Sequence, residues 1–170
     1  MTKYTKLFTI GLALLIGLAA SAFAQNDSAF SLNAQLLVAA RQSDVEGVQQ
    51  SLARGALANS RNRLGKTALF MAIEKNQMEI FSMMLNAGTG VNLASLEKVT
   101  PLIAASYSGN ANMVSQLIAK GAKLEEKDRL HKSALVYAAG MGHHKVVDVL
   151  LGAGALVDAA YIDALTPLMW

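Results

Sequence analysis

The chain has 170 residues, enough for one domain with its own hydrophobic core. Its formal charge is only +3 and 6% of its residues are aromatic, which argues against a nucleic-acid-binding protein, because such proteins concentrate basic charge and use rings for stacking. The absence of Cys excludes disulfides, thiolate metal sites and Cys nucleophiles.

The first 24 residues have the pattern of a secretory signal peptide. A short basic segment, "MTKYTK", precedes an uncharged apolar run over 7–20, and Ala22-x-Ala24 is the small-x-small pattern that signal peptidase recognises. The run is shorter than the roughly 20 residues of a membrane-spanning helix, and no second run follows. We therefore expect cleavage between Ala24 and Gln25, a short linker over 25–32, and a periplasmic or secreted mature protein from a Gram-negative bacterium, free of the membrane.

After the linker, four kinds of residue recur at intervals of 33. Thr or Ser occurs at Thr67, Thr100, Ser133 and Thr166, with Ala34 one step earlier. Leu follows two positions later at Leu36, Leu69, Leu102, Leu135 and Leu168, and Ala five positions later at Ala39, Ala72, Ala105 and Ala138. Gly follows 21 positions later at Gly55, Gly88, Gly121 and Gly154. A fixed period of this length predicts a repeat protein.

Each recurring position has a structural role. The Thr or Ser is typical of a helix N-cap, whose hydroxyl accepts a hydrogen bond from an unpaired N–H. The two prolines of the chain, Pro101 and Pro167, directly follow such a Thr, at the first helical position that proline favours. In the first unit we expect Asn33 to serve as the cap. The Leu and Ala then share one face of the helix.

A second helix is predicted in each unit by paired apolar residues at i, i+1, i+4 and i+5. The stripes are Ile80-Phe81-Met84-Leu85, Met113-Val114-Leu117-Ile118 and Val146-Val147-Leu150-Leu151. Turns are expected at Asn76, Gly109 and Gly142, and the recurring Gly ends the helix. In the first unit Gln49, Gln50 and Ser51 replace apolar residues, as expected of a terminal cap. No unit buries its apolar face alone, so the units must stack.

The stretches "GKTALFMAIEKNQMEIFSMMLNAGTGVN", "TPLIAASYSGNANMVSQLIAKGAKL" and "SALVYAAGMGHHKVVDVLLGAGALVD" resemble ankyrin repeats. The resemblance implies an all-α fold, an α-solenoid of helix-turn-helix units with hairpin-like loops over 33–170. We divide it into a capping repeat (33–60), full repeats (61–93, 94–126 and 127–159) and a partial repeat (160–170). The chain stops early in that last unit, and we expect the natural chain to continue past Trp170.

Two positions depart from the ankyrin pattern. The slot where the family has His holds Phe70, Ile103, Val136 and Met169. The usual loop Gly is kept as Gly65 but is replaced by Lys98, His131 and Ala164, which leaves the loop conformation open.

Other candidate sites are weaker than their structural alternatives. His143 and His144 are adjacent and so point in different directions on a helix, which argues against a metal site, and His143 occupies a slot where the family's His is structural. "GAGAL" follows a helix rather than a strand, unlike a phosphate-binding loop. We predict no cofactor, no metal site and no catalytic residue; a hydrolase with a cryptic site is the disfavoured alternative.

The resemblance implies a protein-binding surface formed by the loops and the ends of the first helices. The residues at those positions are Arg63, Leu64, Lys66, Glu74, Lys75, Leu96, Glu97, Val99, Tyr107, Ser108, Arg129, Leu130, Lys132 and Met141. Tyr107 and Arg129 are the expected anchors, since Tyr and Arg are enriched among residues that dominate binding energy; the alternative is ordinary solvated loops. We thus predict a non-enzymatic protein-binding module. The open alternatives are an inhibitor or immunity protein against an exported toxin, and an accessory factor of a periplasmic enzyme such as catalase.

Overall fold

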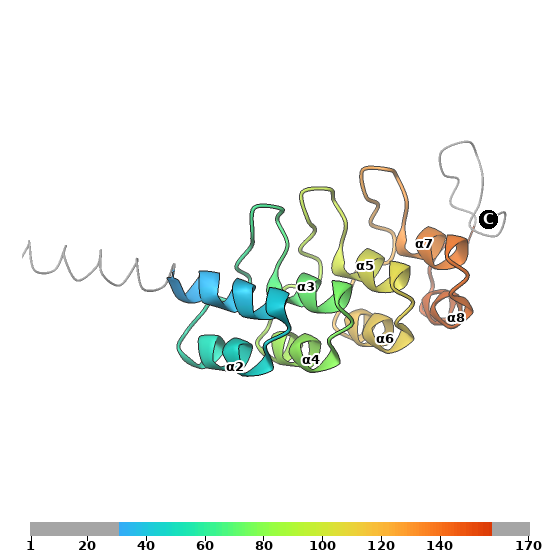
Figure 1. Cartoon of the computed structure of the whole chain (residues 1–170). Helices are drawn as coiled ribbons and strands as arrows, with labels where there is room; N and C mark the ends of the chain where they lie inside the picture. Colours follow the sequence, from blue (N-terminus) through green and yellow to red (C-terminus); the bar gives the residue numbers. More distant parts are fainter. Residues whose placement is uncertain (1–30, 158–170) are drawn as a thin grey trace, which may run out of the picture.

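The computed structural model describes residues 31–157 (Figure 1). The predicted signal peptide with its cleavage point at Ala24 and Gln25, and most of the predicted linker, lie outside these residues. The partial repeat 160–170 and the expected continuation past Trp170 also lie outside them, together with the last two residues of the repeat 127–159.

The described residues form helices and no strand. A first helix over 31–42 is followed by α2 (Val45–Ala53), α3 (Ala68–Glu74), α4 (Met78–Asn86), α5 (Pro101–Tyr107), α6 (Ala111–Ala119), α7 (Ala134–Gly140) and α8 (His144–Gly152). Among them, no helix combines the length and the apolar character that crossing a membrane requires.

The helices lie in two rows, and long loops project from one side of the array (Figure 1). The first helix, α3, α5 and α7 form the row next to the loops, and α2, α4, α6 and α8 form the other. Helix α5 packs between α3 and α7, and α6 packs on α8. The predicted all-α solenoid of helix-turn-helix units is therefore confirmed.

The predicted caps and turns explain where the helices begin and end. The hydroxyls of Thr67 and Thr100 accept hydrogen bonds from the N–H groups of Phe70 and Ile103, each at 3.2 Å. Ser133 stands at the N-cap of α7 without making the capping bond. The predicted turn residues Asn76, Gly109 and Gly142 have φ of 55°, 74° and 71°. This left-handed conformation lets the chain reverse between the two helices of a unit.

The recurring Leu and Ala form the core. Leu36, Leu69, Leu102 and Leu135 are at most 3% exposed, and the recurring Ala residues at most 6%. The second-helix stripes complete the core, with Ile80, Phe81, Met84, Leu85, Met113, Val114, Leu117, Val146 and Leu150 buried. Ile118, Val147 and Leu151 of these stripes are only partly buried.

The first unit differs from the prediction in three respects. Residues 31 and 32 are already helical, so the helix begins before the predicted end of the linker, and Leu32 packs against the core. Asn33 lies within this helix and is not its cap. Ser51 is not an exposed cap residue like Gln49 and Gln50: it is 4% exposed, and its hydroxyl donates to a backbone carbonyl one turn earlier at 2.7 Å.

Asn33 instead holds the loop that follows α2, because its side-chain oxygen accepts a hydrogen bond from the N–H of Leu57 at 2.7 Å. In each later unit, the backbone N–H at the position equivalent to Leu57 donates to a side-chain oxygen of the preceding unit. The pairs are Gly90 N–H to Asn59 (2.8 Å), Lys123 N–H to Asn92 (2.9 Å) and Leu156 N–H to Glu125 (2.9 Å). Asn33 therefore supplies the acceptor that a preceding repeat supplies elsewhere, which suits the first unit of an array.

Candidate partner-binding groove

The tips of three loops, which we call the fingers, comprise residues 61–66, 94–99 and 127–132. Each finger is closed by a backbone hydrogen bond from the N–H of residue 62, 95 or 128 to the carbonyl four residues later, at 2.9, 2.9 and 3.1 Å. Neighbouring fingers are joined by bonds from Leu96 N–H to the Leu64 carbonyl (2.9 Å) and from Arg129 N–H to the Glu97 carbonyl (3.2 Å). The fingers therefore form one continuous row.

The three loops adopt one conformation, although only the first has the family's glycine. Lys98 and His131 adopt φ of 59° and 58° where Gly65 has 74°, so the loops turn alike in all three units. Asn62 and Asp128 each accept two backbone N–H bonds within their own finger, at 2.9 and 3.0 Å. The loop conformation that the sequence left open is thus the same throughout the described repeats.

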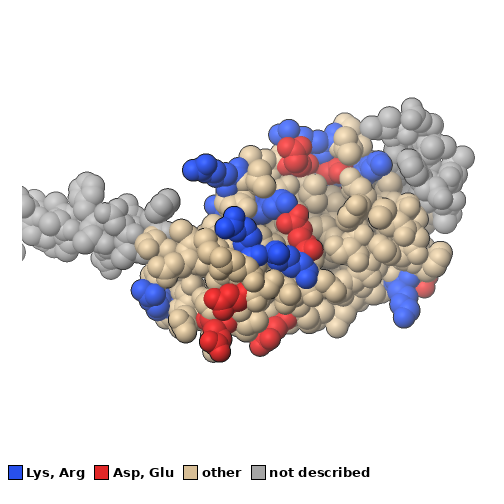
Figure 2. Space-filling view, in the orientation of Figure 1, with Lys and Arg blue, Asp and Glu red and all other residues tan. Residues whose placement is uncertain are grey.

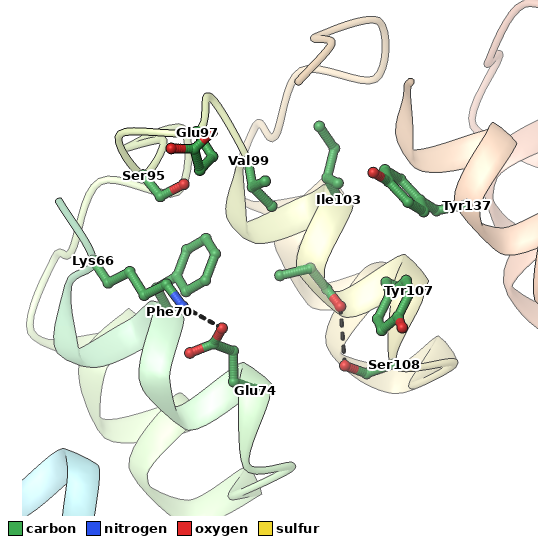
Figure 3. A pocket seen from close by; sticks show the side chains of 11 residues that line it. Lys66, Phe70, Glu74, Ser95, Glu97, Val99, Ile103, Tyr107, Ser108 and Tyr137 are labelled. Atoms are coloured by element: carbon green, nitrogen blue, oxygen red, sulfur yellow. Dashed lines mark hydrogen bonds and ion pairs between the residues drawn. The ribbon is translucent and has the colours of Figure 1, made fainter. Parts of the chain in front are cut away.

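A cavity of about 430 Å³ lies beneath the fingers, between α3 and α5 (Figure 3). Phe70 and Ile103, each only 2% exposed, belong to its lining, together with Val99 from the second finger. The remaining lining residues are Lys66, Glu74, Ser95, Glu97, Ala104, Tyr107, Ser108 and Tyr137. Phe70 and Ile103 occupy the slot where ankyrin repeats usually have His, so that departure makes this part of the surface apolar.

A smaller hollow of about 300 Å³ continues the cavity toward α7. The two hollows share Tyr107 and Tyr137, whose rings meet edge to face at 5.7 Å between centroids and 81° between planes. Val136 and Met141 line the smaller hollow. We call the two hollows with the overlying fingers the groove; Tyr107, 52% exposed, stands at its centre.

Ion pairs hold the charged side chains of the groove in place. Lys66 Nζ lies 2.5 Å from Glu74 Oε1 and 5.2 Å from the centre of the Phe70 ring, and Arg129 lies 3.4 Å from Glu97 (Figure 3 for the first pair). Because the Arg129–Glu97 pair is largely solvated and the Lys66–Glu74 pair partly so, these pairs add little to folding stability but restrict where the side chains point.

Tyr137 links the groove to the third finger. Its hydroxyl donates to Asp128 Oδ2 at 2.5 Å, and Lys132 lies over its ring at 5.7 Å. Partial burial, and next the hydrogen bond to the Asp128 carboxylate, raise the pKa of Tyr137 well above its ordinary value, so the phenol stays protonated and keeps donating. Asp128, 5% exposed, thus has both oxygens occupied, which fixes the ring that separates the two hollows.

The structure brings together some of the residues predicted for binding and leaves others apart. Six line the larger cavity: Lys66, Glu74, Glu97, Val99, Tyr107 and Ser108. Lys132 and Met141 line the smaller hollow with Tyr107, and Arg129 reaches the groove through its pair with Glu97. Arg63, Leu64, Lys75, Leu96 and Leu130 line neither hollow and are exposed.

The prediction missed Phe70, Ser95, Ile103, Ala104, Val136, Tyr137 and Gly140, which line the groove. The unusual apolar residues in the family's His slot were the available signal for three of them, Phe70, Ile103 and Val136. No signal in the sequence marked Tyr137, because its hydrogen bond to Asp128 of the third finger becomes visible only in the folded structure.

His143 is held by a contact within the fold. The His143 ring bonds through Nε2 to the Tyr107 carbonyl at 3.0 Å, under the turn at Gly109. Over residues 31–157 there is no group of three or more His, Cys, Asp or Glu side chains that could hold a metal ion. The carboxylates that line the cavity are paired with cations, so the chemistry of the groove is that of apolar contact and hydrogen bonding.

Comparison with known proteins agrees with this architecture. The family model "Ankyrin repeats (3 copies)" matches residues 36–128 and 83–160. Neurogenic locus notch homolog protein 1 of Mus musculus is 32% identical over 134 residues, covering 78% of this chain and 5% of the relative. Transient receptor potential cation channel subfamily A member 1 of Drosophila melanogaster is 27% identical over 131 residues, covering 74% of this chain and 11% of the relative.

An ankyrin repeat protein of fowlpox virus (strain NVSL), FPV222, is 30% identical over 127 residues, covering 75% of this chain and 17% of the relative. The chain thus spans between 5% and 17% of the length of these three relatives, and the likeness concerns the repeats. Ankyrin repeats are protein-protein interaction modules and are generally not enzymes. The family model covers most of the chain, which therefore belongs to the ankyrin repeat family.

Proposed function

We propose that this protein is exported and binds a segment of another protein in the groove, without catalysing a reaction. The observation that carries the proposal is the cavity of about 430 Å³ beneath the fingers, with its apolar lining. Concave apolar sites with a few polar groups are the usual form of a binding site. The exposed ring of Tyr107 at its edge is of the residue type that dominates binding energy in protein interfaces.

The groove is also preorganised, which favours binding. Tyr107 contacts the ring of Tyr137, Tyr137 is held by Asp128, and Lys66 is held by Glu74. Side chains that are already restricted lose less conformational entropy when a partner arrives, so more of the contact energy appears as affinity.

Export is supported by the basic segment, the apolar run and the Ala-x-Ala of the first 24 residues. Mass spectrometry of the protein purified from the periplasm of its host should find Gln25 at the N-terminus. Soluble protein that still begins at Met1 would contradict export, while leaving the binding proposal in place.

Site-specific photocrosslinking tests the binding proposal directly. A photoreactive phenylalanine analogue would replace Tyr107 or Met141 in the groove and, as the control, the exposed Gln49 on α2 in the opposite row of helices. We expect the two groove positions to capture the same protein from a periplasmic extract and Gln49 not to capture it. Capture from Gln49 alone would place the interface on the row of α2, α4, α6 and α8.

The identity of the captured protein decides among the alternatives for the biological role. An exported toxin would indicate an inhibitor or immunity protein, and an exported enzyme such as a catalase would indicate an accessory factor. Both roles use the same groove, so the structure favours neither.

A further inference from the structure

We infer that the groove binds an extended, acidic segment of its partner that carries apolar side chains for the two hollows. This inference rests on the proposed function and specifies the chemistry of the partner. It follows from where charge lies on the protein, which groups are already neutralised, and how the hollows are arranged.

The fingers are basic and the rest of the described protein is not. The three fingers carry seven Lys and Arg against two acidic residues, whereas the remainder of residues 31–157 carries six against seven. In the orientation of Figure 2, basic side chains gather where the fingers project in Figure 1, and a large uncharged area lies beside them. A ligand in the groove therefore meets a positive rim and an apolar interior.

The carboxylates near the groove offset only part of this positive rim, because Glu74, Glu97 and Asp128 are three against the seven Lys and Arg of the fingers. Glu74 is paired with Lys66 at 2.5 Å and Glu97 with Arg129 at 3.4 Å. Asp128 is buried and accepts from Tyr137 and from two backbone N–H groups. An acidic ligand would therefore meet little unneutralised negative charge.

Two basic side chains on the rim have no counter-ion among the described residues. Arg63 and Lys98 are exposed on the first two fingers, and within residues 31–157 neither side chain has a hydrogen bond or an ion pair. They stand on the same fingers as Lys66 and Val99, which line the cavity. A carboxylate on a bound segment would complement them, and complementary charge speeds association and selects partners.

The arrangement of the hollows indicates an extended segment. The larger hollow is formed by α3 and α5 with Tyr137 of α7, and the smaller one by Tyr107 of α5 with α7. A ligand that fills both must cross successive helices and pass the Tyr107–Tyr137 pair. An extended chain advances about 3.3 Å per residue and alternates its side chains, so it can place apolar residues in the hollows and acidic ones against the rim.

Selection from a library of random 12-residue peptides, displayed on phage, would test this inference with the purified full chain. We expect the enriched peptides to be rich in Asp and Glu and to contain aromatic or aliphatic residues. A fluorescently labelled enriched peptide would then serve as the probe in anisotropy titrations at two salt concentrations.

The decisive variant is the double charge reversal Arg63→Glu with Lys98→Glu, and the matched control is Lys120→Glu with Lys145→Glu, at the end of α6 and on α8. We expect the finger variant to bind the probe at least about tenfold more weakly and with less dependence on salt, and the control to stay within about twofold. Circular dichroism would verify that both variants remain folded.

The remaining outcomes separate this inference from the proposed function. Neutral or basic enriched peptides that lose binding in Tyr107→Ala but not in the finger variant would overturn the acidic segment and leave the groove as the binding site. Peptides indifferent to both changes would overturn the groove itself. A single-stranded oligonucleotide that binds tightly and loses binding in the finger variant, where no acidic peptide binds, would identify the rim as a nucleic-acid surface and overturn the inference.

Discussion

Two adjacent positions in α3, α5 and α7 meet different physical demands. The first holds Leu69, Leu102 and Leu135, identical and buried in every unit. The next residue along each helix is Phe70, Ile103 or Val136, different in every unit and set toward the groove. The Leu position packs against neighbouring units, whereas the next position, although similarly buried at 2% exposure, lines the groove.

The contrast extends to the ends of these helices. Glu74, Tyr107 and Gly140 occupy one register position and differ in size and charge. Glu74 and Tyr107 line the larger hollow, and Gly140 lines the smaller one. In these first helices, the identical Leu position therefore belongs to the stacking surface, and the two variable positions line the surface available to a partner. The following predictions test that division, from the largest expected effect to the smallest.

Leu102→Ala should lower the free energy of unfolding by about 2–5 kcal/mol, because it leaves a cavity in a core where Leu102 is 1% exposed. The matched control is Leu130→Ala, the same change at a finger residue that is 59% exposed, for which we expect less than about 0.5 kcal/mol. Urea unfolding followed by circular dichroism measures both. Equal losses in the two variants would remove the distinction between stacking and groove surfaces.

Gly109→Ala should destabilise the fold by about 2–3 kcal/mol, of which about 1 kcal/mol reflects the left-handed backbone and the rest the displaced His143 hydrogen bond. An added Cβ would lie 2.6 Å from Cε1 of His143, and φ is 74°. Gly121→Ala is the control, since φ there is 84° but no atom lies within 4 Å of the new Cβ. If the two variants have the same unfolding midpoint in urea, the His143 contact contributes nothing.

Tyr107→Ala should weaken binding of the partner, once captured, by about 1–3 kcal/mol while the fold remains stable. The side chain is 52% exposed, and the His143 bond uses only the backbone carbonyl of Tyr107, which the substitution retains. Tyr107→Phe keeps the ring and should bind nearly as well as the wild type in isothermal titration calorimetry. Unchanged affinity in Tyr107→Ala, Arg129→Ala and Leu130→Ala would move the interface away from the groove.

Ser106→Ala should raise the free energy of unfolding by about 0.5–1 kcal/mol. Ser106 is fully buried, and its hydroxyl has no hydrogen-bond partner in the described part of the chain. The same register position is Ala40 in the first helix, Ile73 in α3 and Ala139 in α7, so the stack accepts Ala there. Ser115→Ala, at an exposed residue of α6, is the control with little expected change in thermal stability. A loss of stability in Ser106→Ala would mean that the hydroxyl has an unseen structural role.

Much of the repeat architecture could be predicted from the sequence because the physics that determines it is local. The Thr100 hydroxyl caps its helix by accepting a hydrogen bond from the N–H three residues later. Gly109 reverses the chain at its own position. The period of 33 then places Leu69, Leu102 and Leu135 on one buried face in every unit. These features require only neighbouring residues and the repeat interval.

The first unit shows where this reasoning fails. Asn33 resembled a helix cap by its position, but its side chain bonds Leu57, far along the chain, across the end of the array. Ser51 resembled an exposed polar residue, but it is buried, with its hydroxyl bonded to the preceding turn of its own helix. In both cases a polar side chain satisfies a hydrogen bond whose partner becomes clear only in the folded chain.

The candidate site divides in the same way. The sequence by itself determined the repeat and its resemblance to ankyrin repeats, and that resemblance implied that Tyr107, Glu74 and Val99 lie beside a common surface. Only the tertiary structure decided that these residues enclose a cavity with Phe70 and that a second ring, Tyr137, separates it from a further hollow. The reason is that a groove is formed by side chains from three units, whose sizes and pairings, unlike the repeat period, depend on contacts between distant residues.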